Sequence, residues 1–483
     1  MAMSDALESE VRSYCRSWPV VFDRAAGSRL YARDGTPYLD FFAGAGALNY
    51  GHNNPVLKAA LFDYLNRDGV VHALDMFTVA KSEFLEALAD VVLTPRHLDY
   101  KVVFPGPGGA NAVEAALKLA RLVTGRHSVV SFTNSFHGMT LGALAVSGNA
   151  SKRAAAGVPL THVTTLPYDG YPGGGDAPAL LERLLTDPGS GYDLPAAVIV
   201  ETVQGEGGLH AASGAWLRAL AEVCRRLDVL LVVDDVQMGC GRTGAFFSFE
   251  DAGITPDIVC LSKSIGGYGL PMALTLIRPD LDVWRPGQHN GTFRGVSPSF
   301  VTGAEALRTY WADGDLEKSV RAKGERLRAV LGEVAREFPE AGAEVRGRGM
   351  AVGLRFGAAG GGGPTAAQLI CAAAFERGLL VETSGAADDV VKLLPPLTVG
   401  EDELDEGLEI VTAAVRAVLT RVSERPPVVP AAGRPGAGRP DADRSDAGRS
   451  DPGRPGADGT ASDGNAAGGT GAVRPGAGER TPV

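Results

Sequence analysis

The stretch Val229-Leu-Leu-Val-Val-Asp-Asp-Val-Gln-Met-Gly-Cys-Gly-Arg-Thr-Gly244 decides how we expect this chain to fold. Its apolar start, Val229 to Val233, predicts a buried strand that carries Asp234 at its carboxyl end. A second run, Asp257-Ile-Val-Cys-Leu-Ser262, delivers Lys263 in the same way. Two parallel strands would therefore present an acid and an amine at one edge of a sheet, where open α/β folds bind ligands.

This pair of side chains favours pyridoxal phosphate as a cofactor. The cofactor's aldehyde needs a lysine to form a Schiff base, and its ring nitrogen needs a carboxylate in order to stay protonated. Lys263 and Asp234 are the two candidates. Since any α/β enzyme can end one strand in Asp and another in Lys, the pair alone does not decide between this cofactor and an unrelated function.

Composition and charge exclude several other classes of function. The 483 residues carry a formal net charge of −11, which disfavours nucleic acid as a partner. The apolar runs are of strand length, well short of the roughly 20 residues that a membrane span needs. We therefore expect no membrane segment and, because the first residues do not resemble a signal peptide, a cytoplasmic protein. The five cysteines and eight histidines show neither paired nor metal-ligand spacing, so no disulfide framework and no metal site are predicted.

Three glycine-containing segments are candidates for ligand loops. The segment Phe41-Phe-Ala-Gly-Ala-Gly-Ala-Leu-Asn-Tyr50 allows close backbone approach to a ligand, and Tyr50 would line it, although a turn packed under a helix explains the same residues. A glycine-rich turn then precedes a helix whose first amides, at Gly109 and Ala110, would bind a phosphate. The third segment, Phe136-His-Gly138, offers an aromatic ring for stacking, or a plain core phenylalanine.

Several of these motifs together resemble the class III aminotransferases of fold type I. The likeness rests on Asp234-Asp-Val-Gln237, on Gly239-Cys-Gly-Arg-Thr-Gly244 and on the pattern ExxQGExG at Glu201-Thr-Val-Gln-Gly-Glu-Gly-Gly208, and it covers roughly residues 5 to 420. The resemblance implies an α/β protein with a large domain, whose seven-stranded-type sheet is mostly parallel. A smaller α/β domain would be built from both ends of the chain.

The resemblance also implies roles for individual residues. Lys263 would bind the cofactor and move the proton, Asp234 would stabilise the charged ring nitrogen, and Gln237 would hydrogen-bond the ring's 3-oxygen. Phe136 and Val236 would pack on opposite faces of the ring, with His137 supporting the loop. The full set expected around the cofactor is Gly109, Ala110, Phe136, His137, Glu201, Asp234, Val236, Gln237, Lys263 and Thr292.

Thr292 implies a homodimer or a higher homo-oligomer with shared active sites. In the family, a threonine at this place reaches the phosphate of the neighbouring subunit, and Gly291-Thr-Phe293 resembles that loop. A solvent-exposed loop is the plain alternative for this segment.

Glu206, Lys392 and Tyr50 are the residues expected to contact substrate. In relatives the second glutamate of the ExxQGExG pattern pairs with an arginine that otherwise takes a substrate carboxylate. Here Lys392 stands at the arginine position, and a lysine is a point charge that cannot clamp a carboxylate in a bidentate way.

This lysine, together with the loops around Tyr50 and Gly69-Val-Val-His-Ala-Leu-Asp-Met76, resembles the diaminobutyrate-forming members of the family, which serve ectoine synthesis. They imply glutamate as amino donor and aspartate 4-semialdehyde as acceptor, with 2-oxoglutarate and L-2,4-diaminobutyrate as products. The alternatives are another ω-aminotransferase acting on ornithine, 4-aminobutyrate or a siderophore or antibiotic precursor, an aminomutase, and a catalytically silent relative.

Four segments make up the predicted domain organisation. Residues 1–59 form an amino-terminal segment of the small domain, 60–320 the large cofactor-binding domain, and 321–422 the carboxy-terminal small domain. Residues 423–483 contain no Leu, Ile, Met or aromatic residue, so they cannot bury enough apolar surface to fold and are expected to be a disordered tail.

Overall fold

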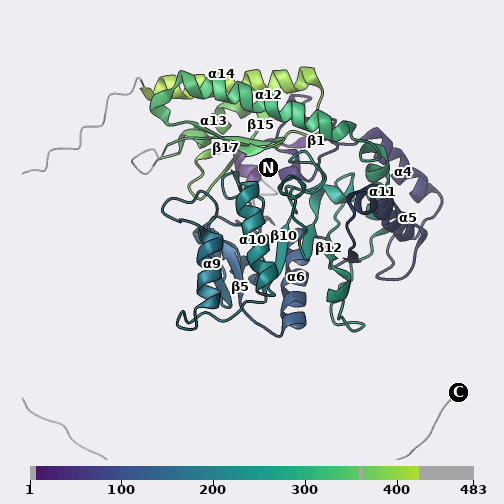
Figure 1. Cartoon of the computed structure of the whole chain (residues 1–483). Helices are drawn as coiled ribbons and strands as arrows, with labels where there is room; N and C mark the ends of the chain where they lie inside the picture. Colours follow the sequence, from purple (N-terminus) through teal and green to yellow (C-terminus); the bar gives the residue numbers. More distant parts are fainter. Residues whose placement is uncertain (1–6, 358–362, 424–483) are drawn as a thin grey trace, which may run out of the picture. The chain divides into compact units, whose positions relative to one another are not determined.

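The computed structural model describes residues 7–357 and 363–423, so the tail predicted at 423–483 lies outside it apart from residue 423. A seven-stranded sheet forms the centre of the larger part of the fold (Figure 1). In spatial order its strands are β4 (Lys101–Val103), β12 (Leu274–Ile277), β11 (Ile258–Leu261), β10 (Leu230–Asp234), β7 (Ala197–Val200), β5 (Val129–Phe132) and β6 (Val163–Leu166). Only β12 runs antiparallel to its neighbours within this sheet, which confirms the prediction of a mostly parallel sheet.

Strand β10 is buried on both faces, because helices cover the two sides of the sheet. Leu231 and Val233 pack with helix α10 (Gly214–Arg226) in one apolar cluster, whereas Leu230 and Val232 pack with helix α6 (Gly109–Thr124) in another. A strand enclosed on both sides has to be apolar at every position, which explains its uninterrupted hydrophobic run. The first carboxylate, Asp234, therefore stands where the strand leaves the core.

A second apolar core lies between helices and a four-stranded antiparallel sheet. The strands of this sheet, in order, are β13 (Glu344–Arg348), β14 (Ala351–Arg355), β17 (Val390–Leu393) and β16 (Glu382–Ser384). The helices are α12 (Asp315–Glu337), α13 (Ala366–Phe375) and α14 (Glu401–Ser423), which lie together in Figure 1.

The amino-terminal strands join this part of the fold. Strands β1 (Phe22–Ala26), β2 (Arg29–Ala32) and β3 (Pro37–Asp40) form an antiparallel sheet, and β15 (Leu379–Leu380) adds to β3 in a parallel pair. The smaller α/β part is thus built from both ends of the chain, as the sequence predicts. The domain boundaries stay a prediction, and α12 runs through the one expected at 320/321 without a break.

The stretch from Leu379 to Glu382, whose apolar start predicts a single strand, divides between two. Leu379 and Leu380 pair with β3, whereas Glu382 begins β16 and pairs with β17 in the other sheet. Val381, buried between them, is the point at which the chain changes sheets. This change depends on which backbone partner lies on each side, so the local residue pattern could not indicate it.

The remaining helices flank the sheets. Those of at least five residues are α4 (Pro55–Asn66), α5 (Val79–Ala87), α7 (Leu141–Ala145), α8 (Ala150–Ala154), α9 (Ala177–Thr186) and α11 (Ser297–Tyr310). Within residues 7–357 and 363–423, no helix combines the length and the apolar character that crossing a membrane requires.

Leu231→Ala should lower the free energy of unfolding by about 2–5 kcal/mol, because it leaves a cavity in a fully enclosed strand. Leu369→Ala is the matched control: this leucine is 38% exposed on α13 and should cost less than about 0.5 kcal/mol. Urea unfolding followed by circular dichroism measures both changes. Equal losses in the two variants would contradict the placement of β10 in the core.

Candidate active site

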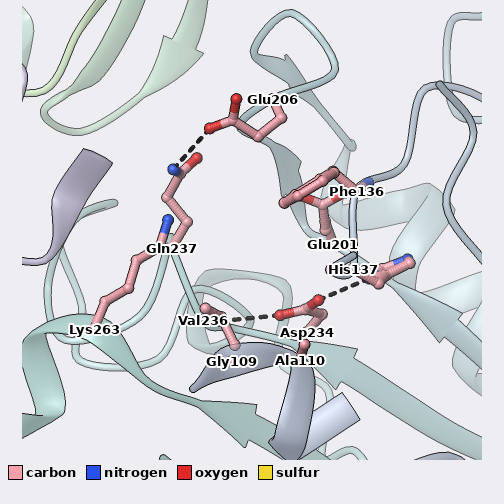
Figure 2. A pocket seen from close by; sticks show the side chains of 11 residues that line it. Gly109, Ala110, Phe136, His137, Glu201, Glu206, Asp234, Val236, Gln237 and Lys263 are labelled. Atoms are coloured by element: carbon pink, nitrogen blue, oxygen red, sulfur yellow. Dashed lines mark hydrogen bonds and ion pairs between the residues drawn. The ribbon is translucent and has the colours of Figure 1, made fainter. Parts of the chain in front are cut away.

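A cavity of about 180 Å³ opens at the carboxyl ends of the central strands. Eleven residues line it: Gly109, Ala110, Phe136, His137, Gly138, Glu201, Glu206, Asp234, Val236, Gln237 and Lys263. Asp234 is the last residue of β10, and Lys263 follows β11, the parallel neighbour of β10. The structure therefore brings together the acid and the amine that the sequence singled out, from two adjacent strands (Figure 2).

The backbone of another segment orients the side-chain amine of Lys263. Its Nζ donates a hydrogen bond to the carbonyl of Ala45 at 2.8 Å, and both residues have left-handed backbone conformations, with φ of 54° and 56°. Such conformations cost a non-glycine residue of order 1–3 kcal/mol and cluster at functional sites. Burial lowers the pKa of Lys263 to about 8, so a substantial fraction of the amine is uncharged in mildly alkaline solution.

Gln237 connects the same carbonyl to a cavity carboxylate. Its Nε2 donates to the Ala45 carbonyl at 3.0 Å and to Glu206 Oε1 at 3.1 Å. The neighbouring Gly205 leaves room for this side chain, because a Cβ on that residue would lie 1.7 Å from Gln237 Oε1. The glycine of the ExxQGExG pattern is therefore required by packing against the glutamine, and not by its own backbone conformation.

Asp234 is fixed by two hydrogen bonds. Its Oδ2 lies 2.7 Å from His137 Nδ1, and its Oδ1 accepts the backbone N–H of Val236 at 3.1 Å. Burial favours the neutral imidazole, but the hydrogen bond and charge of Asp234 outweigh it and raise the pKa of His137 above its usual value. His137 therefore lies fixed against Asp234, a supporting role in agreement with its place beside the cavity.

Glu201 has a different environment from Asp234. Its Oε2 accepts the backbone N–H of Phe136 at 2.9 Å, and burial, with the nearby charge of Asp234 adding to it, raises the pKa of Glu201 to about 8. At neutral pH this carboxyl group is mostly protonated. The cavity therefore holds one acid that is hydrogen-bonded to His137 and a second, neutral acid beside Phe136.

The start of α6 forms the floor of the cavity. Amides in the first turn of a helix have no intrahelical acceptor, and together with the helix dipole they favour an anion. A Cβ on Gly109 would lie 2.7 Å from Val236 Cγ1, so only glycine fits at this approach of α6 to the β10 loop. The side chains of Gly108 and Ala110 provide no hydroxyl, which leaves phosphate binding at this end to backbone donors from this chain.

Three expected site residues do not line the cavity. Tyr50 is buried in the core, where its hydroxyl accepts from Trp311 Nε1 at 2.9 Å and its ring stacks on Tyr310. The expectation that Tyr50 lines a ligand is therefore not met, because the aromatic neighbours take up its ring and its hydroxyl. Thr292 is exposed, and its carbonyl lies 2.7 Å from His72 Nε2.

Lys392, the third, is enclosed behind the cavity wall. Its Nζ lies 2.8 Å from Glu206 Oε1 and 2.9 Å from Glu382 Oε1. Glu206 is thus the residue that links Lys392 to the cavity. Glu382 was not among the residues predicted from the sequence, although a carboxylate at the end of the apolar run 379–382 is a signal that a buried cation lies nearby.

Comparison with known proteins identifies the family. A profile described as "Aminotransferase class-III" matches residues 12–415. The chain belongs to the class III aminotransferases. This aminotransferase is 63% identical over 417 residues to a diaminobutyrate–2-oxoglutarate transaminase of Nocardia farcinica. The aligned region covers 86% of this chain and 94% of the relative. The chain is 54% identical over 420 residues to one of Halalkalibacterium halodurans, with 87% and 97% covered.

Solved structures agree with the fold. The ornithine aminotransferase of Toxoplasma gondii superposes with a TM-score of 0.75 at 25% identity, over 87% of this chain and 95% of that one. An aminotransferase of Bacillus anthracis gives a TM-score of 0.77 at 22% identity, over 86% and 97%. This aminotransferase therefore has the fold type I architecture, as its sequence predicts.

The reaction of Lys263 with an added aldehyde cofactor should depend on pH with a midpoint near 8. Only the uncharged amine attacks a carbonyl, so lowering the pKa from 10.5 to about 8 makes attachment faster as pH rises through 8, and constant above about 9. Stopped-flow absorbance after mixing apoenzyme with pyridoxal phosphate, from pH 7 to 10, measures the rate. A rate still rising steeply above pH 9.5 would contradict the effect of burial, and Lys263→Ala should give no attachment signal.

Proposed function

We propose that this aminotransferase moves the amino group of L-glutamate to L-aspartate 4-semialdehyde, giving 2-oxoglutarate and L-2,4-diaminobutyrate. The observation that carries the proposal is the 63% identity, over 86% of the chain, to a relative named for diaminobutyrate and 2-oxoglutarate. Identity at this level across the whole catalytic part favours the same pair of substrates. The product would serve ectoine synthesis, on the resemblance of the amino-terminal loops.

The cavity fits pyridoxal phosphate, the cofactor of this family. It offers one amine, one carboxyl group held by His137, a helix start with a close-packed glycine, and a buried Gln237 Oε1 that finds no donor among the residues the structure describes. Lys263 would hold the aldehyde end, Asp234 the ring nitrogen, and the first amides of α6 the phosphate. When bound, the cofactor supplies an electron sink for the carbon that bears the transferred amino group.

The protein's own contribution is to position charges and move one proton. Lys263 Nζ would take the proton from the amine-bearing carbon of the substrate, a task suited to an amine whose pKa lies near the working pH. The Ala45 carbonyl, 2.8 Å from this nitrogen, would orient the amine whenever it is not covalently engaged. His137, whose Nδ1 lies 2.7 Å from Asp234 Oδ2, would hold this carboxyl group in place toward the ring nitrogen.

A cytoplasmic location agrees with the chemistry of the cysteines. All five are free, and Cys240 and Cys260 are buried beside the site, where burial raises the pKa of both thiols. Unpaired cysteines, one of them exposed, are typical of a reducing compartment.

A homodimer with shared sites is the proposed assembly. Apolar side chains gather on two adjoining segments: His72 lies against Phe293 edge to face, and a Cβ on Gly295 would lie 1.7 Å from the Leu74 carbonyl. The large hydrophobic side chains that these segments and their neighbours expose are Val70, Val71, Leu74, Met76, Phe77, Val79 and Phe293. Contiguous apolar surface of this kind marks a protein interface, and Thr292 lies within it.

The substrate proposal predicts a clear order of acceptors. After glutamate has loaded the enzyme with the amino group, aspartate 4-semialdehyde should restore the absorbance of the cofactor aldehyde about 10- to 200-fold faster than glutamate 5-semialdehyde or succinate semialdehyde, which differ by one methylene or one charged group. Equal rates would favour a broader ω-aminotransferase. Failure to release one 2-oxoglutarate per amino group transferred would instead favour an aminomutase.

The dimer proposal predicts that Phe77→Asp separates the subunits. Phe77 is 95% exposed, so a charge there costs an isolated subunit little but would have to be desolvated in the interface. Sedimentation velocity should show monomers, with weaker cofactor binding because Thr292 of a second subunit is lost. Leu369→Asp, on an exposed helix position away from this surface, should stay dimeric; dissociation of both variants, or of neither, would contradict the assignment of the interface.

A further inference from the structure

A buried cluster of three charges lies directly behind the cavity. Lys392 Nζ is 2.8 Å from Glu206 Oε1 and 2.9 Å from Glu382 Oε1, and the Lys392 side chain is fully buried. A buried ammonium is stable only with a closely placed counter-charge. Here two carboxylates share one ammonium, which is more than its charge requires.

The two carboxylates are attached to the fold in different ways. Glu382 lies in β16 directly opposite Lys392 in β17, so the antiparallel register of the two strands fixes this pair. Glu206 lies in the turn between β8 (Val203–Gln204) and β9 (His210–Ala211). Of the three side chains only Glu206 lines the cavity, so a ligand can reach its carboxylate without reaching Glu382.

We infer that Glu382 is the permanent counter-ion of Lys392. In the family, a substrate carboxylate takes the place of the glutamate that corresponds to Glu206; if the same exchange occurs at Lys392, Glu382 keeps the ammonium charged and in place while Glu206 is displaced. Glu382 is thus a positioning residue that acts through Lys392. This inference rests on the proposed function, because it requires glutamate, whose carboxylate is next to the reacting amine.

The electrostatics agree with such an exchange. Burial raises the pKa of Glu382, and the negative charge of Glu206 adds to this effect against the attraction of Lys392. Lys392 and Lys263 more than offset the burial of Glu206 and lower the pKa of its carboxyl to about 2. When Glu206 turns away, its repulsion on Glu382 is removed, and Glu382 becomes the sole partner of the ammonium. Burial, together with the negative charges of Glu382 and Glu206, raises the pKa of the Tyr14 hydroxyl, which places this neutral donor near the fixed carboxylate.

The two half-reactions make different demands on the cluster. Glutamate reacts at its α-amine and brings its α-carboxylate to the place of Glu206. Diaminobutyrate reacts at its terminal amine, and its carboxylate lies three carbons away, so the contact between Glu206 and Lys392 stays closed. Loss of Glu382 should therefore slow the first half-reaction selectively, because Lys392 would then depend on Glu206 alone and would not release it.

Glu382→Gln in the holoenzyme tests the inference. The two half-reactions are measured separately by single-turnover absorbance of the bound cofactor, with glutamate and with L-2,4-diaminobutyrate. The measured quantity is the rate constant divided by the half-saturating concentration of the substrate. It should fall about 10- to 150-fold for glutamate, which is the range expected when a charge-assisted contact is lost. For diaminobutyrate it should stay within about twofold of the unmodified enzyme. Glu382→Asp, which keeps the charge, should restore most of the glutamate rate.

Glu337→Gln is the matched control, since it removes a carboxylate from an exposed ion pair with Arg416 and should change neither half-reaction. If Glu382→Gln loses the same factor in both half-reactions, the inference is overturned in favour of a purely structural role. If Glu382→Gln does not fold, the same result for Glu382→Asp overturns it. An unchanged glutamate rate would overturn it as well. Failure of the unmodified enzyme to release 2-oxoglutarate from glutamate is a separate result, and it would overturn the proposed function itself.

Discussion

The parallel pairing of β10 with β11 is the constraint on which the rest of the site depends. Asp234 lies opposite Cys260 in this pair, and Lys263 follows where β11 ends, so backbone hydrogen bonds alone bring the acid and the amine to one edge. Parallel strands have their carboxyl ends at the same edge of a sheet, and helices on both faces exclude water from everything behind it. The cavity that both side chains line therefore lies at this edge.

Within that cavity, charges are distributed by burial and by partner. Asp234 has His137 as its partner, whereas Glu201, equally enclosed but with a backbone N–H as its donor, has a pKa that burial raises to about 8. Partners also decide the charge of Lys392, which lies behind the cavity wall and stays charged between the carboxylates of Glu206 and Glu382. A transamination site needs charges of both signs near one ring, and each charge here has a specific partner.

Much of the fold and of the site could be predicted from the sequence, because both depend partly on short-range rules. The apolar run before Asp234 predicted a buried strand, and the glycine turn before Gly109 predicted a helix start at a ligand. Three outcomes were not predictable: the burial of Tyr50 in the core, the change of sheets at Val381, and the pairing of Glu382 with Lys392. Each depends on which segment lies alongside in the folded chain and in which register, and a local pattern of residue types does not contain that information.

The sequence by itself determined the class of fold, the family motifs and the identity of most cavity residues, because strand ends and glycine turns place side chains through local backbone geometry. Only the tertiary structure decided which residues share a charge. The cross-strand register of β16 and β17 pairs Glu382 with Lys392, and the turn that carries Glu206 brings it to the same ammonium from 186 residues away in the chain. Coulomb energy depends on the distance between charges in space, so the partner of each charge can be identified only in the folded chain.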